Sequence, residues 1–146
     1  ATRTKFSYQD SDWLDTRPPE ISWVDYYQRV TQEHKRARKT KELINSIYST
    51  ELPYKIKLSN IFQTWRFNIY VEKKEEILKT IQEAGFFASG HYESLTGIFA
   101  PGQAPIAEKV YKNIINLFND RYFDTNKASN LSKLLTSLHL TPPSQF

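Results

Sequence analysis

The chain contains no cysteine and no methionine among its 146 residues. Without cysteine it can form no disulfide framework, no thiolate zinc site and no cysteine nucleophile. It also has no apolar run long enough to span a bilayer, and polar residues follow the basic N-terminus where a signal peptide would have its apolar region. We therefore expect a protein without membrane contact, with the cytoplasm as the default location. Because the first residue is not methionine, we expect either a processed N-terminus or a piece of a longer protein.

Histidine and glycine are also scarce. The three histidines, His34, His91 and His139, are too far apart to predict a metal site. Gly97 and Gly102 are neither followed by a lysine nor preceded by a clear strand, so no phosphate-binding loop is predicted. No serine lies in a nucleophile-elbow context, which argues against a self-contained hydrolase.

The remaining composition is that of one ordinary folded domain. Apolar residues make up 39% of the chain and aromatic residues 14%, and 146 residues can bury a sizeable core. We expect an irregular or extended leader at residues 1–19, a single domain at residues 20–140 and a short tail at residues 141–146.

Apolar periodicity predicts four helices. From Glu20 onward, apolar positions recur at steps of three, four and seven, which indicates an amphipathic helix of about seven turns, with Ser22 as its candidate cap. Glu75 and Glu76 open a second helix, which we expect Gly85 to close in a left-handed conformation. A third stripe follows Pro105, and it comprises Ile106, Val110, Tyr111, Ile114, Leu117 and Phe118. A last helix is expected after Asp124 or Thr125, with Ala128, Leu131, Leu134, Leu135 and Leu138 facing inward.

The strongest strand signal is at residues 64–72, where apolar and polar residues alternate. Trp65, Phe67, Ile69 and Val71 are expected on the inward face. Residues 86–90 form a second short apolar strand, residues 92–104 a loop, and Tyr122 and Phe123 a minimal third strand. The predicted class is α+β: a long N-terminal helix and a small, mostly antiparallel sheet covered on one face by helices.

A dense basic cluster lies on the long helix. It comprises His34, Lys35, Arg36, Arg38, Lys39 and Lys41. Such a face can neutralise nucleic-acid phosphates, but Glu33 and Glu42 flank it and no zinc-finger or RNP-type motif accompanies it. An ordinary solvated helix face is the favoured interpretation, and nucleic-acid binding stays open as an alternative.

The most suggestive local site is the segment Ser89-Gly90-His91-Tyr92-Glu93, where a strand passes into a long loop. Functional residues often lie at such points because the strand positions them and the loop leaves them accessible. His91 can transfer a proton near neutral pH, and Tyr92 offers a hydroxyl or a stacking face. A purely structural histidine is the alternative interpretation.

Several motifs between Glu20 and Leu138 occur in an order that resembles a known family. They are an aromatic strand at Trp65 to Val71, Gly85-Phe86, Gly90-His91-Tyr92, Pro105-Ile106-Ala107-Glu108, an aromatic-rich segment at Leu117 to Phe123, and a closing helix. This order resembles the C-terminal small domain of the DegT-type aminotransferases. These are pyridoxal-phosphate enzymes of fold type I that mostly act on nucleotide-linked keto sugars. The long basic helix is similar to the helix that links the two domains in that family.

The resemblance implies roles for three residues. His91 and Tyr92 match the family's substrate-side His-Tyr pair. Arg17, in Thr16-Arg17-Pro18-Pro19, is placed like an arginine near the cofactor phosphate, and its guanidinium suits bidentate phosphate binding. The family's large N-terminal domain, which carries the Schiff-base lysine, has no counterpart in these residues. The resemblance therefore implies an inactive fragment that binds no pyridoxal phosphate by itself.

Our leading expectation is thus the C-terminal domain of a pyridoxal-phosphate-dependent sugar aminotransferase. Its partners would be the missing large domain and a nucleotide-sugar substrate, and the complete enzyme would be a homodimer. Related dehydratases share the fold and the cofactor and remain open. Two alternatives come from other classes: a non-catalytic interaction module, and a small nucleic-acid-binding domain that uses the basic helix.

Overall fold

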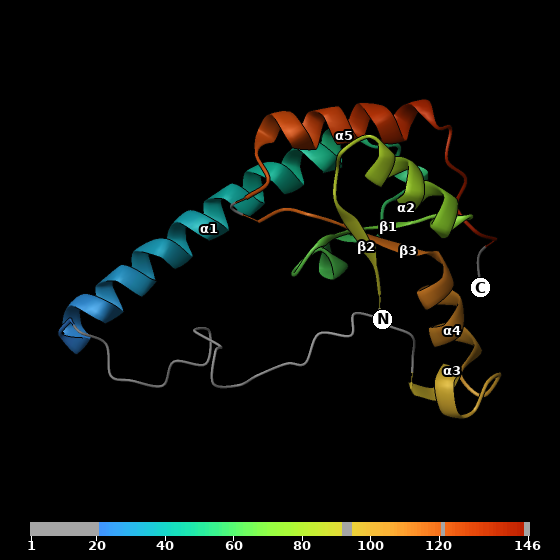
Figure 1. Cartoon of the computed structure of the whole chain (residues 1–146), viewed down its shortest axis with the longest axis horizontal. Helices are drawn as coiled ribbons and strands as arrows, with labels where there is room; N and C mark the ends of the chain where they lie inside the picture. Colours follow the sequence, from blue (N-terminus) through green and yellow to red (C-terminus); the bar gives the residue numbers. More distant parts are fainter. Residues whose placement is uncertain (1–20, 92–94, 121, 145–146) are drawn as a thin grey trace. The chain divides into compact units, whose positions relative to one another are not determined.

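The structure is a computed structural model, and it describes residues 21–91, 95–120 and 122–144 (Figure 1). The chain divides into two compact units, Ala1–Lys35 and Arg36–Phe146. The expected leader at residues 1–19 lies outside the described residues.

In the first unit, the described residues form the beginning of helix α1, Trp23–Glu51. Ser22 caps this helix as expected: its Oγ accepts a hydrogen bond from the Asp25 backbone N–H at 3.1 Å and donates to Asp25 Oδ2 at 2.6 Å. The apolar side chains of this first part of α1 are exposed, Trp23 to 68% and Tyr27 to 72%. They therefore add little to a core.

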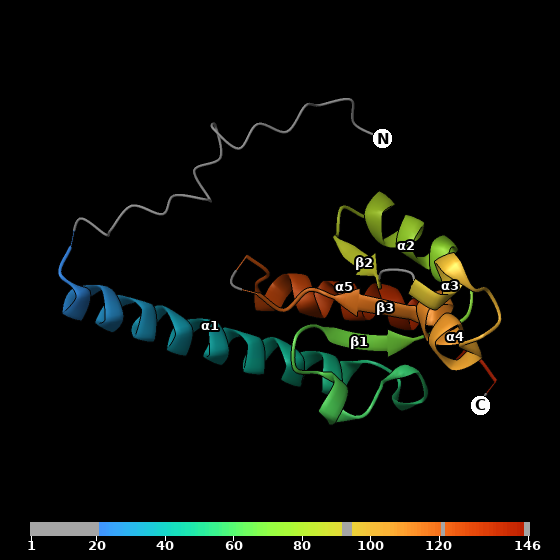
Figure 2. The ribbon, with the colours of Figure 1, turned by 90° about the horizontal axis from the view of Figure 1, so that it is seen from below.

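In the second unit, three short strands form one antiparallel sheet. They are β1 (Phe67–Tyr70), β2 (Ala88–Gly90) and β3 (Ile114–Leu117), and their spatial order is β1-β3-β2. Figure 2 shows β3 between the other two. Leu117 is opposite Phe67 on one side and opposite Ala88 on the other, so β3 sets the register of both pairs.

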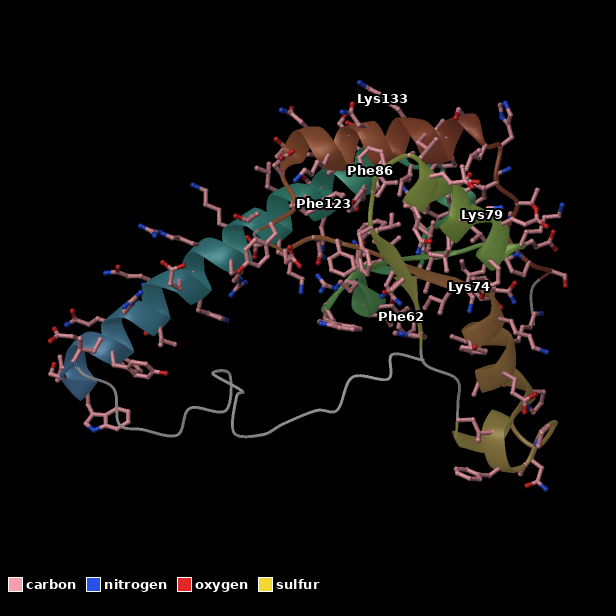
Figure 3. All side chains as sticks on the ribbon, viewed as in Figure 1. Phe62, Lys74, Lys79, Phe86, Phe123 and Lys133 are labelled. Atoms are coloured by element: carbon pink, nitrogen blue, oxygen red, sulfur yellow. The ribbon has the colours of Figure 1, made fainter. Side chains whose placement is uncertain are left out.

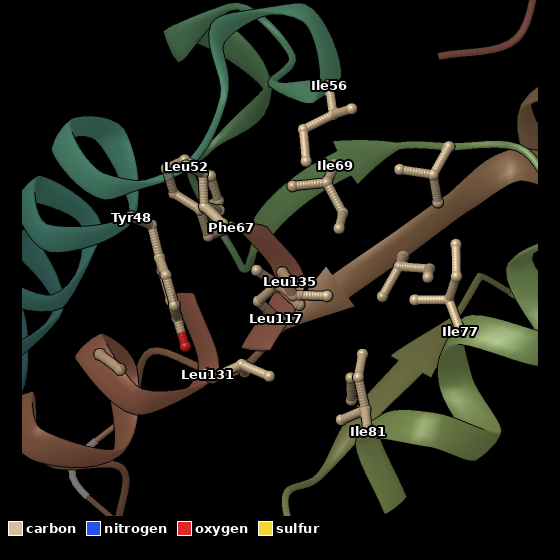
Figure 4. Packing of buried hydrophobic residues seen from close by; sticks show 14 of the residues in the cluster. Tyr48, Leu52, Ile56, Phe67, Ile69, Ile77, Ile81, Leu117, Leu131 and Leu135 are labelled. Atoms are coloured by element: carbon tan, nitrogen blue, oxygen red, sulfur yellow. The ribbon is translucent and has the colours of Figure 1, made fainter. Parts of the chain in front are cut away.

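Helices cover one face of this sheet and enclose the core. The end of α1 contributes Tyr48, α2 (Lys74–Glu83) contributes Ile81, and α5 (Thr125–Ser137) contributes Leu131 and Leu135. These side chains pack against Phe67 and the other inward residues of the sheet (Figure 4). The expected α+β class, with its long N-terminal helix and its antiparallel sheet covered by helices, is confirmed.

Several expected local features are also confirmed. Gly85 follows α2 with φ of +80°, a backbone conformation that favours glycine. Pro105 is the first residue of α4, Pro105–Asn113. Asp124 caps α5, because its side chain accepts a hydrogen bond from the backbone N–H of Lys127 at 2.8 Å.

Four expectations were wrong. The helix after Pro105 ends at Asn113, and the next four residues form the central strand β3. Spacing alone does not separate a short buried strand from a helix turn, since apolar residues occupy most positions in both. Trp65 is 60% exposed, because β1 begins only at Phe67. Tyr122 and Phe123 lie outside every strand, and the expected loop after β2 contains a short helix, α3 (Leu95–Phe99).

The segment between α1 and β1 contains two 3-10 helices, η3 (Tyr54–Ile56) and η4 (Asn60–Phe62). After α5, residues 141–144 form neither helix nor strand. This tail is nevertheless attached to the domain, since the Glu72 backbone N–H donates to the Thr141 carbonyl at 3.0 Å.

Candidate functional site

His91 directly follows β2, as its place in the sequence predicts, and its side chain is half-buried. The side chain beside it is Asn116 of β3, which is fully buried. Asn116 Nδ2 donates to the Ser89 carbonyl at 3.2 Å and lies 3.5 Å from His91 Nδ1. Because the Ser89 carbonyl can only accept, the Asn116 side-chain atom that contacts it is the amide nitrogen. The same nitrogen therefore faces His91.

The face of the sheet opposite the core is polar at its centre. Phe67, Ile69, Ile115 and Leu117 point into the core, so the residues between them, Asn68 and Asn116, share the other face and are direct cross-strand partners. Asn68 is only 8% exposed. Within the described residues, the side-chain oxygens of Asn68 and Asn116 are buried without a hydrogen-bond partner. The polar face of the sheet thus contains two buried acceptors, while the Asn116 amide nitrogen is the atom that faces His91.

Lys74, the first residue of α2, is buried close to Gly90, the last residue of β2. Lys74 is 5% exposed, and its Nζ donates to the Tyr111 carbonyl at 2.7 Å and lies 4.2 Å from the centre of the Tyr111 ring (Figure 3). A Cβ atom at Gly90 would lie 3.2 Å from that Nζ. The residue before His91 therefore has little room for a side chain.

A second candidate site is an open cavity of about 320 Å³ at the other end of β2. Five aromatic residues line it, Phe86, Phe87, Phe118, Tyr122 and Phe123, together with Gly85, Asp120 and Lys127. The rings of Phe87 and Phe118 meet edge to face, with centroids 4.8 Å apart. Figure 3 labels Phe86, which lies just before β2, and Phe123, which lies just before α5.

Arg66 contacts two of the residues that line this cavity, Phe118 and Asp120. Its guanidinium carbon lies 3.7 Å from the centre of the Phe118 ring, and its Nη1 binds Asp120 Oδ2 at 3.0 Å. The side chains of Arg66 and Asp120 are 16% and 33% exposed, so water screens this pair only in part. The other carboxylate oxygen of Asp120 accepts from the Tyr122 backbone N–H at 3.0 Å.

The basic cluster on α1 is exposed along most of its length. Arg38 pairs with Glu42 at 2.8 Å, and both side chains are largely exposed, an arrangement typical of a solvated helix face. Lys41 differs, because its Nζ donates to the Thr64 carbonyl. Burial and the neighbouring Arg66 lower the pKa of Lys41.

The structure places only one of the three predicted site residues. His91 lies at the end of β2, whereas Tyr92 and Arg17 lie outside the described residues. The aromatic cavity and the buried Asn116 were not predicted. The sequence carries a signal for the cavity, since aromatic residues are dense both at residues 86–87 and at residues 118–123. Only the fold, however, brings these two segments together.

No group of three or more histidine, cysteine or acidic side chains in the described part of the chain could hold a metal ion. A search of the same residues finds no helix with the length and apolar character needed to cross a bilayer. Comparisons with known proteins find no matching family model, no matching curated protein and no matching solved structure.

Proposed function

We propose that this chain is the small domain of a larger pyridoxal-phosphate-dependent aminotransferase that acts on a nucleotide-linked keto sugar. The observation that carries the proposal is the position of His91. It stands at the end of the second strand, where the resemblance requires a substrate-side histidine, and its ring lies 3.5 Å from the buried Asn116. The order of helices and strands around it is compatible with the same family.

In this proposal no described residue of the chain holds the cofactor. Among them, the most deeply buried lysine is Lys74, and its Nζ donates to the Tyr111 carbonyl. Arg17, the implied phosphate ligand, lies outside the described residues. In this proposal the missing large domain carries the cofactor, and we assign no step on the cofactor to this chain.

In this proposal, the present chain orients the substrate. His91 offers a ring nitrogen for hydrogen bonding to a sugar hydroxyl, and Asn116 restrains the other side of that ring. Substitution of His91 would remove about one hydrogen bond to the substrate. Such a bond stabilises the transition state by about 1 kcal/mol.

The test uses the complete reading frame that contains this chain. We expect its purified product to show the absorbance of bound pyridoxal phosphate and to transfer an amino group to a nucleotide-linked keto sugar. Residues 1–146 alone should show neither. A reading frame without a cofactor-binding domain would contradict the proposal and would favour a non-catalytic interaction module.

A pair of variants tests the role of His91 separately. We expect His91→Ala to lower kcat/KM by about five-fold, which corresponds to the loss of about 1 kcal/mol, while cofactor absorbance is unchanged. His34→Ala removes an exposed histidine from α1 and should leave kcat/KM unchanged. If the complete enzyme is active and both variants keep the wild-type kcat/KM, the proposed function stands, but His91 is not part of the substrate site.

A further inference from the structure

The aromatic cavity between the start of β2 and the start of α5 has the dimensions of a small-molecule site. Its volume of about 320 Å³ is at the lower end of the range of about 300–1,000 Å³ that is usual for ligand pockets. Three of its rings, Phe86, Phe118 and Phe123, are partly or fully buried, whereas Phe87 and Tyr122 are 57% and 73% exposed. The rings therefore form an apolar floor and an open rim.

The aromatic lining of this cavity favours flat, apolar groups. Phe87 and Phe118 already meet edge to face, and a planar aromatic ring can extend that packing by stacking or by a further edge contact. The Arg66 guanidinium lies over Phe118 and fixes the orientation of this ring. One or two fused aromatic rings fit within the cavity's volume of about 320 Å³.

The acidic and the basic groups at the cavity differ in their capacity for a further partner. Both carboxylate oxygens of Asp120 already have partners, Arg66 and the Tyr122 backbone N–H. Among the described residues that line the cavity, the cation is Lys127, whose side chain is 53% exposed. Its contacts are long: 3.8 Å to Asp124 Oδ2 and 3.5 Å to the Tyr122 carbonyl. An ammonium with three donors can therefore take a further anionic partner.

We infer that this cavity is a binding site for a small planar aromatic anion, whose ring packs among Phe87, Phe118 and Tyr122 and whose acidic group binds Lys127. The site does not depend on the proposed aminotransferase function, because all its residues come from this chain. The interaction of an exposed lysine with an anion contributes up to about 1 kcal/mol, which is about five-fold in affinity.

Three indole derivatives that differ in charge test this site on the chain of residues 1–146. They are indole-3-acetate, its neutral amide and the cation tryptamine, each titrated while amide chemical shifts are followed by two-dimensional NMR. We expect the shifts to concentrate at Gly85, Phe87, Tyr122 and Lys127. The acetate should bind about five-fold more tightly than the amide, and tryptamine should bind most weakly.

Matched variants separate the ring contacts from the charge contact. Lys127→Ala should bring the affinities of acetate and amide together, whereas Lys133→Ala, on the same helix but outside the cavity (Figure 3), should keep the five-fold difference. Phe87→Ala should weaken all three ligands by about five-fold. Phe99→Ala, which removes a ring that is 80% exposed and outside the cavity, should not.

Three results would overturn the inference. They are shifts that are absent or lie elsewhere, a preference for tryptamine over the acetate, and an affinity difference that persists in Lys127→Ala. Amide spectra of the unliganded variants show whether each one keeps the fold, so a misfolded variant is recognised and replaced by the milder Phe87→Leu.

Discussion

Tyr48 is the clearest place to test the packing of this domain. Its side chain is fully buried, its ring lies 5.1 Å from that of Phe67, and its hydroxyl donates to the Phe118 carbonyl at 3.0 Å. Tyr48→Phe keeps the ring and removes only the donor. At pH 8 we expect the free energy of unfolding to fall by about 1 kcal/mol, because the Phe118 carbonyl loses a hydrogen bond.

This destabilisation should depend on pH in a definite direction. Burial raises the pKa of the Tyr48 phenol above its ordinary value. Above the unfolded-state pKa of about 10, the unfolded chain loses the phenol proton while the folded protein keeps it. The wild type therefore loses about 1.4 kcal/mol of stability per pH unit through this group, and the phenylalanine variant does not.

The two effects oppose each other, so the stability curves should cross. The variant is less stable at pH 8 by about 1 kcal/mol, and at pH 11 it should be slightly more stable than the wild type, since the wild type has then lost about 1.4 kcal/mol. Urea unfolding at several pH values between 8 and 11 measures this difference. A difference that stays constant across the series would refute the burial of Tyr48 as a neutral donor.

Tyr54→Phe is the matched control, because it removes the same atom from a side chain that is 90% exposed. Its effect on the free energy of unfolding should stay within about 0.5 kcal/mol at every pH, as for most surface substitutions.

Three further substitutions test the packing and the cap by urea unfolding at neutral pH. Lys74→Met keeps the buried stem but removes the hydrogen bond and the cation–π contact with Tyr111, and should cost about 1–2 kcal/mol. Asp124→Ala removes the acceptor for the Lys127 backbone N–H at the start of α5 and should cost about 1 kcal/mol. Leu135→Ala empties a fully buried position of α5 and should cost about 2–5 kcal/mol. An effect of Leu135→Ala below that of Asp124→Ala would contradict the placement of Leu135 in the core.

The helices could be predicted from the sequence because their ends carry local signals. Ser22, Asp124 and Pro105 act through hydrogen bonds or backbone angles within a few residues of themselves. The inward face of α5 follows from the spacing of its leucines, and Leu131 and Leu135 are indeed fully buried.

The sheet and the site could be predicted only in part, because they depend on distant partners. Ile114 and Leu117 fit the helical stripe of α4 equally well, and only pairing with β1 and β2 makes their segment a strand. Trp65 continues the alternation of β1 in sequence but lies outside the strand. His91 was found because it follows a strand, whereas Asn116 was not, since an asparagine between apolar residues gives no local signal of burial.

The strand order has a consequence for how the protein is made. β3 is the last of these three strands in sequence, yet it lies at the centre of the sheet, and both β1 and β2 take their register from it. During synthesis, these two strands emerge from the ribosome long before the segment Ile114–Leu117 that joins them. Until then their apolar faces and strand edges stay open to other chains. The sheet therefore cannot form until Ile114–Leu117 has been made, and slow or interrupted synthesis before that segment prolongs the exposure of β1 and β2 to aggregation.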